Sequence, residues 1–194
     1  GDGSSNQWFG TRDYQTNRYF NYVGGQFIWA AFDYLGEAGP WPSKGSRKNL
    51  IETTGFRKPF SYYIQTLYTD TPLVHIAVAD PHFYADRQKY GGFDWLSLRS
   101  DWDWSPRYDS LRIYTFSNQP EVELILNGKS LGTKFLKDYP ERIISWEVPN
   151  TPGVIKALAK RSGKTMATHM LQTTGQASHL VLVADQQTLN CSGE

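Results

Sequence analysis

The sequence predicts a mostly β fold, in which an immunoglobulin-like antiparallel β-sandwich follows an α/β segment. Short apolar strands recur with turn signals between them over about the last hundred residues, which is typical of a sandwich. Before residue 70, one apolar strand, a long loop and a helix follow one another in the order of a parallel α/β repeat. We therefore expect two parts, residues 1–70 and residues 71–194.

The first part contains few predicted elements. A short helix of mixed polarity is expected over 11–22, and Gln26–Phe32 is almost entirely apolar, as in a strand buried on both faces of a parallel sheet. Residues 38–57 have no period and predict a long loop, and a helix begins at Pro59. Its apolar stripe follows the spacing i, i+3, i+4, i+7: Phe60, Tyr63, Ile64 and Leu67. One strand and one or two helices cannot bury both faces of a parallel sheet, so we expect this part to belong to something longer.

The second part reads as a series of short strands. Alternation over 121–126 predicts a half-buried strand, and Asn127-Gly128 after it is a strong hairpin signal because both residues tolerate positive φ. A second tight turn is expected at Ser162-Gly163. The other predicted strands are Leu73–Ala79, Leu111–Phe116, Ile143–Val148, Val154–Lys160, Lys164–Gln172 and His179–Ala184.

Composition excludes several classes of function. The net charge is +1, and no basic run interleaves with aromatic residues, so nothing indicates a nucleic-acid partner. No apolar stretch approaches the roughly 20 residues that span a bilayer, so no membrane partner is expected. Cys191 is the one cysteine, so an internal disulfide is impossible and the compartment stays undetermined.

The histidines and glycines carry no recognisable cofactor motif. His75 lies in an apolar strand and is interpreted as a core histidine, and no histidine has the spacing of a metal site. Neither a Ser-His-Asp order with a nucleophile elbow nor a phosphate-binding glycine loop is present. We expect no metal site and no cofactor.

Three tryptophans lie close together in the sequence: Trp95, Trp102 and Trp104. On an extended segment Trp102 and Trp104 point to the same side. Exposed, they would form a stacking platform for a glycan, as in a carbohydrate-binding module. Buried, they would anchor the long loop onto the sandwich or its neighbour, which is the interpretation we favour.

The order of motifs resembles glycoside hydrolase family 2, the β-galactosidase and β-glucuronidase group. The runs GGQFIWAAFDYLGEAGPWP and TTGFRKPFSYYIQTLYTDTPLVHI are similar to the end of its (β/α)8 catalytic barrel. The later runs VELILNGKSLGTK, SWEVPNTPGVIKALAKRSGK and TTGQASHLVLVAD resemble the immunoglobulin-like domain that follows the barrel. The resemblance implies that residues 1–70 are the C-terminal portion of the barrel and that residues 71–194 are the sandwich domain.

The resemblance also implies which residues meet a substrate. Trp29 would lie near the C-terminal end of a barrel strand, where such enzymes have their active sites, and would line the sugar subsite; otherwise it is a barrel-core residue. Retaining glycosidases need two carboxyl groups about 5–5.5 Å apart, but the family's catalytic glutamates come from earlier strands, so none is expected in this chain. Asp33 is more simply an acceptor for loop backbone or an arginine, and Glu37 orients the exit loop, reaches the substrate or is a solvated carboxylate.

The function implied is therefore that of a fragment of a retaining, β-galactosidase-like β-glycosidase. It would contribute the pocket rim (Trp29, Asp33 and Glu37) and a supporting sandwich, with a carbohydrate substrate and the remaining barrel and N-terminal domains of the same protein as partners. The alternative is a non-catalytic carbohydrate-binding module that uses Trp95, Trp102 and Trp104. A periplasmic or extracellular location is expected only if the source is a glycan-degrading bacterium.

Overall fold

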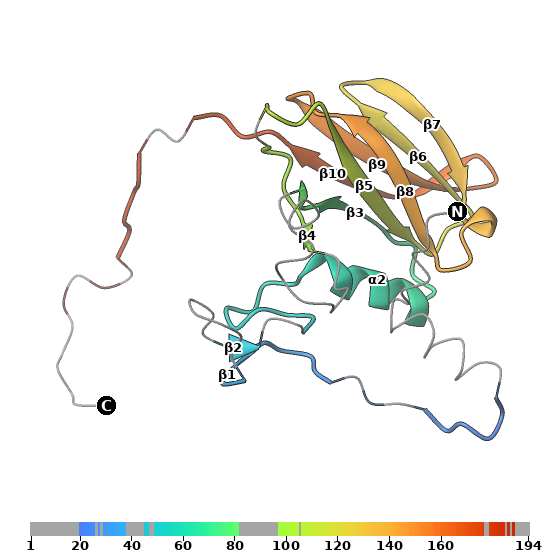
Figure 1. The fold of residues 1–194 in the computed structure, drawn as a ribbon, viewed down its shortest axis with the longest axis horizontal. Coiled ribbons are helices and arrows are strands. Elements are labelled where there is room, and N and C mark those ends of the chain that lie inside the picture. The colour runs from blue at the N-terminus through green and yellow to red at the C-terminus, as the bar shows by residue number, and fades with distance from the viewer. Residues whose placement is uncertain are drawn as a thin grey trace.

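Two four-stranded antiparallel sheets make up the body of the protein (Figure 1). The computed structural model describes residues 20–25, 27, 29–37, 45–46, 49–81, 97–104, 106–176, 179–184, 186 and 188. One sheet has the strand order β10-β9-β6-β7, and the other has the order β4-β3-β5-β8. The predicted β-sandwich is thus confirmed.

Six of the eight strands agree closely with the predicted ranges, whereas Leu98–Arg99 and Lys129–Phe135 were not predicted as strands. In the first sheet the strands are β6 (Glu121–Leu126), β7 (Lys129–Phe135), β9 (Val154–Arg161) and β10 (Lys164–Gln172). In the second sheet they are β3 (Val74–Ala79), β4 (Leu98–Arg99), β5 (Ser110–Ser117) and β8 (Ile143–Pro149). A 3₁₀ helix, η1 (Leu136–Asp138), follows β7.

The two predicted tight turns are present. Asn127 and Gly128 have φ angles of 49° and 81°, and Ser162 and Gly163 have φ angles of 50° and 76°, the left-handed conformations that such hairpin turns require. The Asn127 side chain also links two hairpins, because its Oδ1 accepts a hydrogen bond from the Val154 amide at 2.8 Å. Its close approach leaves no room for a side chain at residue 153, which is glycine.

Apolar side chains from both sheets meet in the main core. Every second residue of β3 points into it, namely Val74, Ile76 and Val78, and the alternating positions of β6 do the same. Members on the other strands include Ile113, Trp146 and Ile155.

The helix α2 (Pro59–Tyr68) covers the outer face of the second sheet and forms a second core. Tyr63 is fully buried there, its ring centroid 5.4 Å from that of Phe116, and its hydroxyl donates a hydrogen bond to the Glu141 carbonyl oxygen at 3.1 Å. Burial raises the pKa of the Tyr63 phenol, with the Glu141 charge adding to the effect. Because both faces of the sheet are covered, every residue of β3 is buried.

Two predicted strands are wrong. The described residues of Gln26–Phe32 form only an isolated bridge from Phe32 to Ile51, and Phe27 and Trp29 are exposed. Residues 179–184 belong to no strand, and Leu180 and Leu182 are each 96% exposed. A strand needs neighbours for its backbone groups and its apolar faces. In the described chain the first run meets only residues 49–51, near Phe32, and the second run pairs with no strand. Residues 11–19 of the predicted first helix lie outside the described residues, and 20–22 are not helical.

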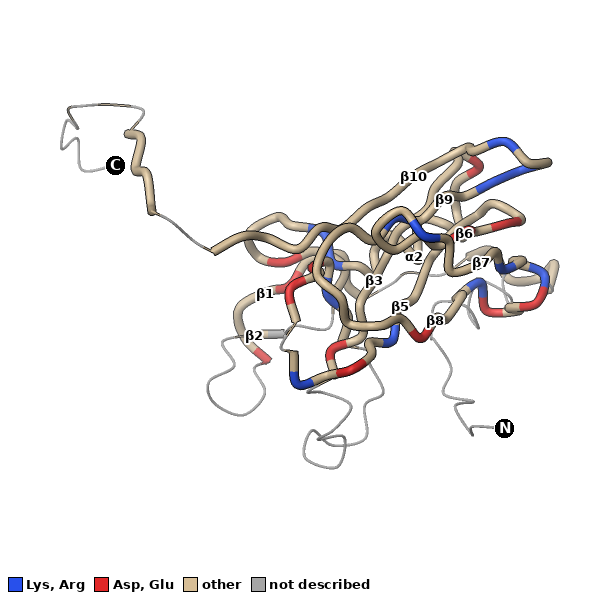
Figure 2. The backbone as a smooth tube through the Cα atoms, turned by 90° about the horizontal axis from the view of Figure 1, so that it is seen from above, with Lys and Arg blue, Asp and Glu red and all other residues tan. Residues whose placement is uncertain are grey.

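Two short strands occur here, one just before the loop predicted over 38–57 and one within it. They are β1 (Tyr34–Leu35) and β2 (Gly45–Ser46), which pair antiparallel. Basic and acidic residues are dispersed over loops and strand ends in the described chain (Figure 2), in agreement with a net charge of +1. Among the described helices, none combines the length and the apolar character that crossing a bilayer requires.

A column of stacked side chains ties α2 to both sheets. The Arg57 guanidinium lies 4.0 Å from the Tyr62 ring centroid, Tyr62 stacks on His75 at 3.9 Å, and His75 lies 4.3 Å from His169 on β10. His169 Nδ1 accepts a hydrogen bond from the Ile76 amide at 3.1 Å. His75 is 3% exposed, as expected of a core histidine.

The titration of His75 makes stability depend on pH. Burial lowers its pKa to about 3, and the nearby His169 and Arg57 charges act in the same direction. Burial lowers the pKa of His169 as well. Because the unfolded protein takes up these protons first, stability is fully present above the unfolded pKa of about 6.5 and falls as the pH drops towards the folded pKa.

We expect His75 alone to cost about 2 kcal/mol of unfolding free energy between pH 7 and pH 5. Guanidinium chloride titrations at the two pH values measure the loss. A His75→Leu variant should show a smaller loss, whereas an equal loss in both proteins would contradict the assignment.

We also expect Leu124→Ala to lower the unfolding free energy by about 2–5 kcal/mol, because Leu124 is fully buried between the sheets. The matched control is Leu180→Ala, where the side chain is exposed and the change should stay within about 0.5 kcal/mol. Similar losses in the two variants would mean that the core is not where the structure places it.

Candidate functional site

The segment from Trp29 to Glu37 is held against residues 49–51 by backbone hydrogen bonds. The carbonyl oxygen of Ala31 accepts from the Leu50 amide at 3.1 Å and from the Ile51 amide at 2.9 Å. The Asp33 amide donates to the Ile51 carbonyl oxygen at 2.7 Å. This short parallel contact holds the segment against the stretch of chain that leads into α2.

Asp33 connects that segment to the start of α2. Its Oδ2 forms an ion pair with Lys58 Nζ at 2.6 Å, and its Oδ1 accepts from the Asn49 amide at 3.2 Å. The Asn49 side chain in turn accepts from the Ala30 amide at 2.9 Å. The expected hydrogen bond from loop backbone is present, and the cation beside Asp33 is a lysine rather than an arginine.

Trp29, Tyr34 and Glu37 form a connected group on the surface. Trp29 Nε1 donates to the Tyr34 hydroxyl oxygen at 3.4 Å, and the two rings meet edge to face with centroids 6.5 Å apart. The Tyr34 hydroxyl donates to Glu37 Oε2. The Trp29 side chain is nevertheless 82% exposed, so an indole face is open to solvent beside a carboxylate.

The backbone turns sharply to bring Glu37 back to Tyr34. Gly36 and Glu37 have φ angles of 100° and 45°, and the second is uncommon for a residue with a side chain. A left-handed non-glycine residue costs of the order of 1–3 kcal/mol and persists where its surroundings hold it, often at functional sites. In this turn the Glu37 carboxylate accepts the hydrogen bond from the Tyr34 hydroxyl.

Tyr34, Asn49 and Lys58 contact the predicted site residues, although no motif in the sequence marks them as functional. The partners of Asn49 and Lys58 are distant in the chain; Asn49 and Asp33, for example, are 16 positions apart. Only the spacing Tyr-x-x-Glu is a local signal, and it is too common to be specific. Trp29 offers an aromatic face, and the Glu37 carboxylate offers hydrogen-bond acceptors. The Asp33 carboxylate is engaged in its ion pair with Lys58.

The three later tryptophans do not form a common surface. Trp95 lies outside the described residues. Trp102 is 3% exposed in the main core and donates from Nε1 to the Thr151 carbonyl oxygen at 3.1 Å. Trp104 packs against the same core, with the Arg99 guanidinium 5.5 Å from its ring centroid. A glycan platform that uses Trp102 is thus incompatible with the fold, and the packing interpretation fits both residues.

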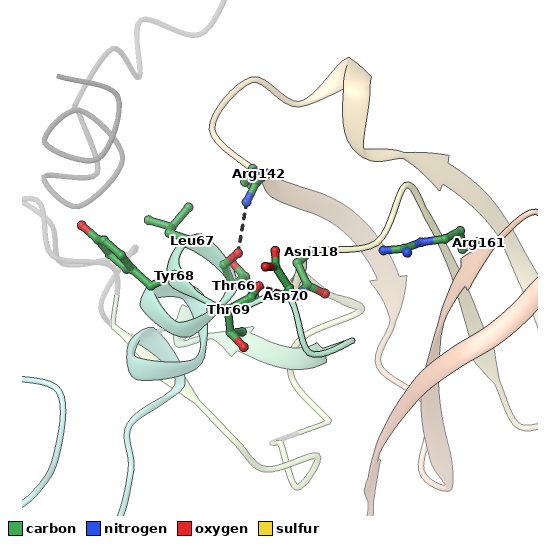
Figure 3. Close-up of a pocket in the computed structure, with 8 residues that line it drawn as sticks. All are labelled: Thr66, Leu67, Tyr68, Thr69, Asp70, Asn118, Arg142 and Arg161. Carbon is green, nitrogen blue, oxygen red and sulfur yellow. Dashed lines mark hydrogen bonds between the residues drawn. The ribbon is translucent and has the colours of Figure 1, made fainter. Parts of the chain in front are cut away.

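A separate pocket of about 450 Å³ opens at the other end of α2 (Figure 3). Arg142 Nη1 donates to the Thr66 carbonyl oxygen there at 3.0 Å, and Asn118 Nδ2 donates to the Thr69 carbonyl oxygen at 2.9 Å. These side chains cap the helix end and fasten it to the sandwich. The remaining lining residues are Leu67, Tyr68, Asp70 and Arg161. In the part of the chain that the structure describes, no group of three or more histidine, cysteine or acidic side chains is placed to hold a metal ion.

Comparison with known proteins identifies relatives of the chain. A protein-family model described as a domain of unknown function, DUF4982, matches residues 109–167. The chain is 31% identical over 90% of its length to the β-galactosidase BoGH2A of Bacteroides ovatus, of which it covers 18%. It is 30% identical over 80% of its length to a putative β-glucuronidase of Formosa agariphila, of which it covers 14%.

A solved structure of a glycoside hydrolase is also similar to this chain. A glycosyl hydrolase family 2 member from Bacteroides cellulosilyticus is 28% identical, with a TM-score of 0.78, and the match covers 91% of this chain and 25% of that one. The chain thus spans less than one fifth of the length of the two curated relatives.

We expect Lys58→Ala to loosen the segment before α2, because it leaves the Asp33 carboxylate unpaired in a site where that side chain is 9% exposed. A hydrogen bond to a charged group contributes about 1.5–3 kcal/mol, so amide exchange at Asp33, Leu50 and Ile51 should accelerate about ten- to a hundredfold. Hydrogen exchange measured by NMR tests this.

The matched control for this change is Lys164→Ala, at an exposed position on β10. It should leave exchange in residues 31–51 unchanged. Equal effects of the two variants, or no effect of Lys58→Ala, would show that the ion pair does not hold the segment.

Proposed function

We propose that this homologue of part of the glycoside hydrolase family 2 enzymes supplies one edge of a sugar-binding site and the β-sandwich that supports it. Its relatives include a β-galactosidase, and glycoside hydrolysis is the activity their names share. In this proposal the full-length protein cleaves terminal β-glycosidic bonds with retention, β-galactosides first among them. The two reacting glutamates lie outside this chain.

The observation that carries the proposal is that the Trp29 indole is exposed while its N–H is hydrogen-bonded. A large aromatic side chain is 82% exposed while its indole N–H is engaged by Tyr34, which in turn is bonded to Glu37. An immobilised, exposed indole is costly to leave in water and is suited to stack on the apolar face of a sugar. Glu37 beside it accepts hydrogen bonds from hydroxyl groups.

The apolar surface around Trp29 supports the proposal that residues 1–70 lie at the edge of a larger domain. Phe27, Phe32, Leu35 and Phe56 are all more than half exposed; the first two lie in the run predicted as a buried strand, and the other two follow it in the chain. Exposed apolar patches of this kind mark interfaces. We propose that residues 1–70 complete a (β/α)8 barrel whose other strands cover this surface, and that residues 71–194 form the sandwich domain behind it.

Asp33 has an organising role in this proposal rather than a direct one. Its carboxylate is engaged by Lys58 and by the Asn49 amide. It therefore positions the residues on either side of it, Trp29 and Glu37, which face the sugar. The binding-module alternative is not proposed, because Trp102 is buried.

We expect Trp29→Ala in the full-length protein to lower kcat/KM for 4-nitrophenyl β-galactoside at least about tenfold, which corresponds to about 1.4 kcal/mol of lost aromatic contact. Trp29→Phe should recover part of the loss. Steady-state kinetics measure both.

Tyr68→Ala is the control, because Tyr68 is an exposed aromatic residue at the opposite end of α2. It should leave kcat/KM within about twofold, the size of an effect of about 0.5 kcal/mol from a surface change. An unchanged kcat/KM in Trp29→Ala would refute the rim proposal. So would hydrolysis by the 194-residue chain alone, because the proposal puts the reacting acids outside it.

A further inference from the structure

We propose that Glu37 is a specificity-determining residue that favours neutral glycosides over glycosides of uronic acids. The inference rests on the proposed function, because it requires a sugar on Trp29. It concerns a choice that the relatives leave open, since they include a β-galactosidase and a putative β-glucuronidase. Galactose is neutral, whereas glucuronic acid carries a carboxylate.

The two acidic residues of the rim differ in how their charge is balanced. Asp33 is paired with Lys58 at 2.6 Å, so its charge is largely cancelled. Glu37 receives its hydrogen bond from the Tyr34 hydroxyl, a neutral donor. Among the residues that the structure describes, no Lys, Arg or His pairs with Glu37. Within the described residues, the Glu37 carboxylate is thus a negative charge without a cationic partner, in contrast to that of Asp33.

That charge is held next to the exposed indole. Glu37 is bonded to Tyr34, and Tyr34 contacts Trp29 both by a hydrogen bond and by an edge-to-face ring contact. The positive φ of Glu37 directs the chain so that its side chain returns to Tyr34 instead of pointing along the segment. One phenol ring thus separates the carboxylate from the surface on which the sugar would stack.

The chemistry of this position distinguishes the two substrate classes. A carboxylate accepts strong hydrogen bonds from the hydroxyl groups of a neutral sugar. It repels a second carboxylate at short range, and the repulsion grows when the substrate displaces water from the site. Like-charge juxtaposition is a common means of rejecting a wrong partner.

The test uses the full-length protein with 4-nitrophenyl β-galactoside and 4-nitrophenyl β-glucuronide. The ratio of the two kcat/KM values should favour the galactoside. Glu37→Gln, which keeps the shape and removes the charge, should reduce this preference about tenfold, and Glu37→Arg should reduce it further. Raising the salt concentration should weaken the preference of the parent protein but not that of Glu37→Gln.

Glu52→Gln is the matched control, because it makes the same change at an exposed acid that bonds Thr54 rather than Tyr34. It should leave the ratio unchanged. An unchanged ratio in Glu37→Gln, an equal shift in Glu52→Gln, or a parent protein that prefers the glucuronide would each overturn the inference.

Failure of the inference can be told from failure of the proposed function. If Trp29→Ala lowers kcat/KM for both substrates while the Glu37 variants keep the ratio, the rim stands and the charge selection is wrong. If Trp29→Ala changes neither substrate, the rim itself is wrong. Calorimetric titration of the same variants with galactose and with glucuronate gives a second measure of the preference that does not depend on turnover.

Discussion

The packing of α2 on the outer face of the second sheet is the contact on which the rest of the structure depends. Tyr63 occupies the centre of this contact, between Phe60 on its own helix and Phe116 on β5. The same helix begins directly after Lys58, the partner of Asp33. The helix therefore connects the sandwich to the segment that carries Trp29 and Glu37, and fixes where that segment lies relative to the sandwich.

This arrangement explains why a β-sandwich would accompany a sugar-binding edge. Exposed segments are mobile unless something fixes them, and a binding residue loses affinity when it must be ordered during binding. Here the Asp33–Lys58 pair, the Asn49 side chain and the backbone contacts to Ile51 fix the segment in advance. The sandwich supplies the buried area that this local network lacks.

Local patterns in the sequence predicted those elements that local physics determines. Asn127-Gly128 specifies its hairpin because both residues accept positive φ, and the stripe from Phe60 to Leu67 identifies α2 because a single face of it is buried. The runs Gln26–Phe32 and His179–Ala184 have equally strong strand patterns, yet their described residues belong to no strand. A strand also depends on neighbouring strands that its own residues do not encode. The roles of Tyr34 and Lys58 cannot be predicted from the sequence for the same reason. They depend on the contacts with Glu37 and Asp33 and not on the residue types alone. The resemblance to glycoside hydrolases, in contrast, was carried by the order of whole motifs and was confirmed by the relatives.

The most direct measurement is a crystal structure of the full-length protein with a monosaccharide bound in its active site. Our account predicts that the Trp29 indole lies against the sugar within about 4 Å, the distance of ordinary contact, with the Glu37 carboxylate beside it. A sugar bound at a distance from this segment, or a Trp29 side chain buried under another domain, would contradict it.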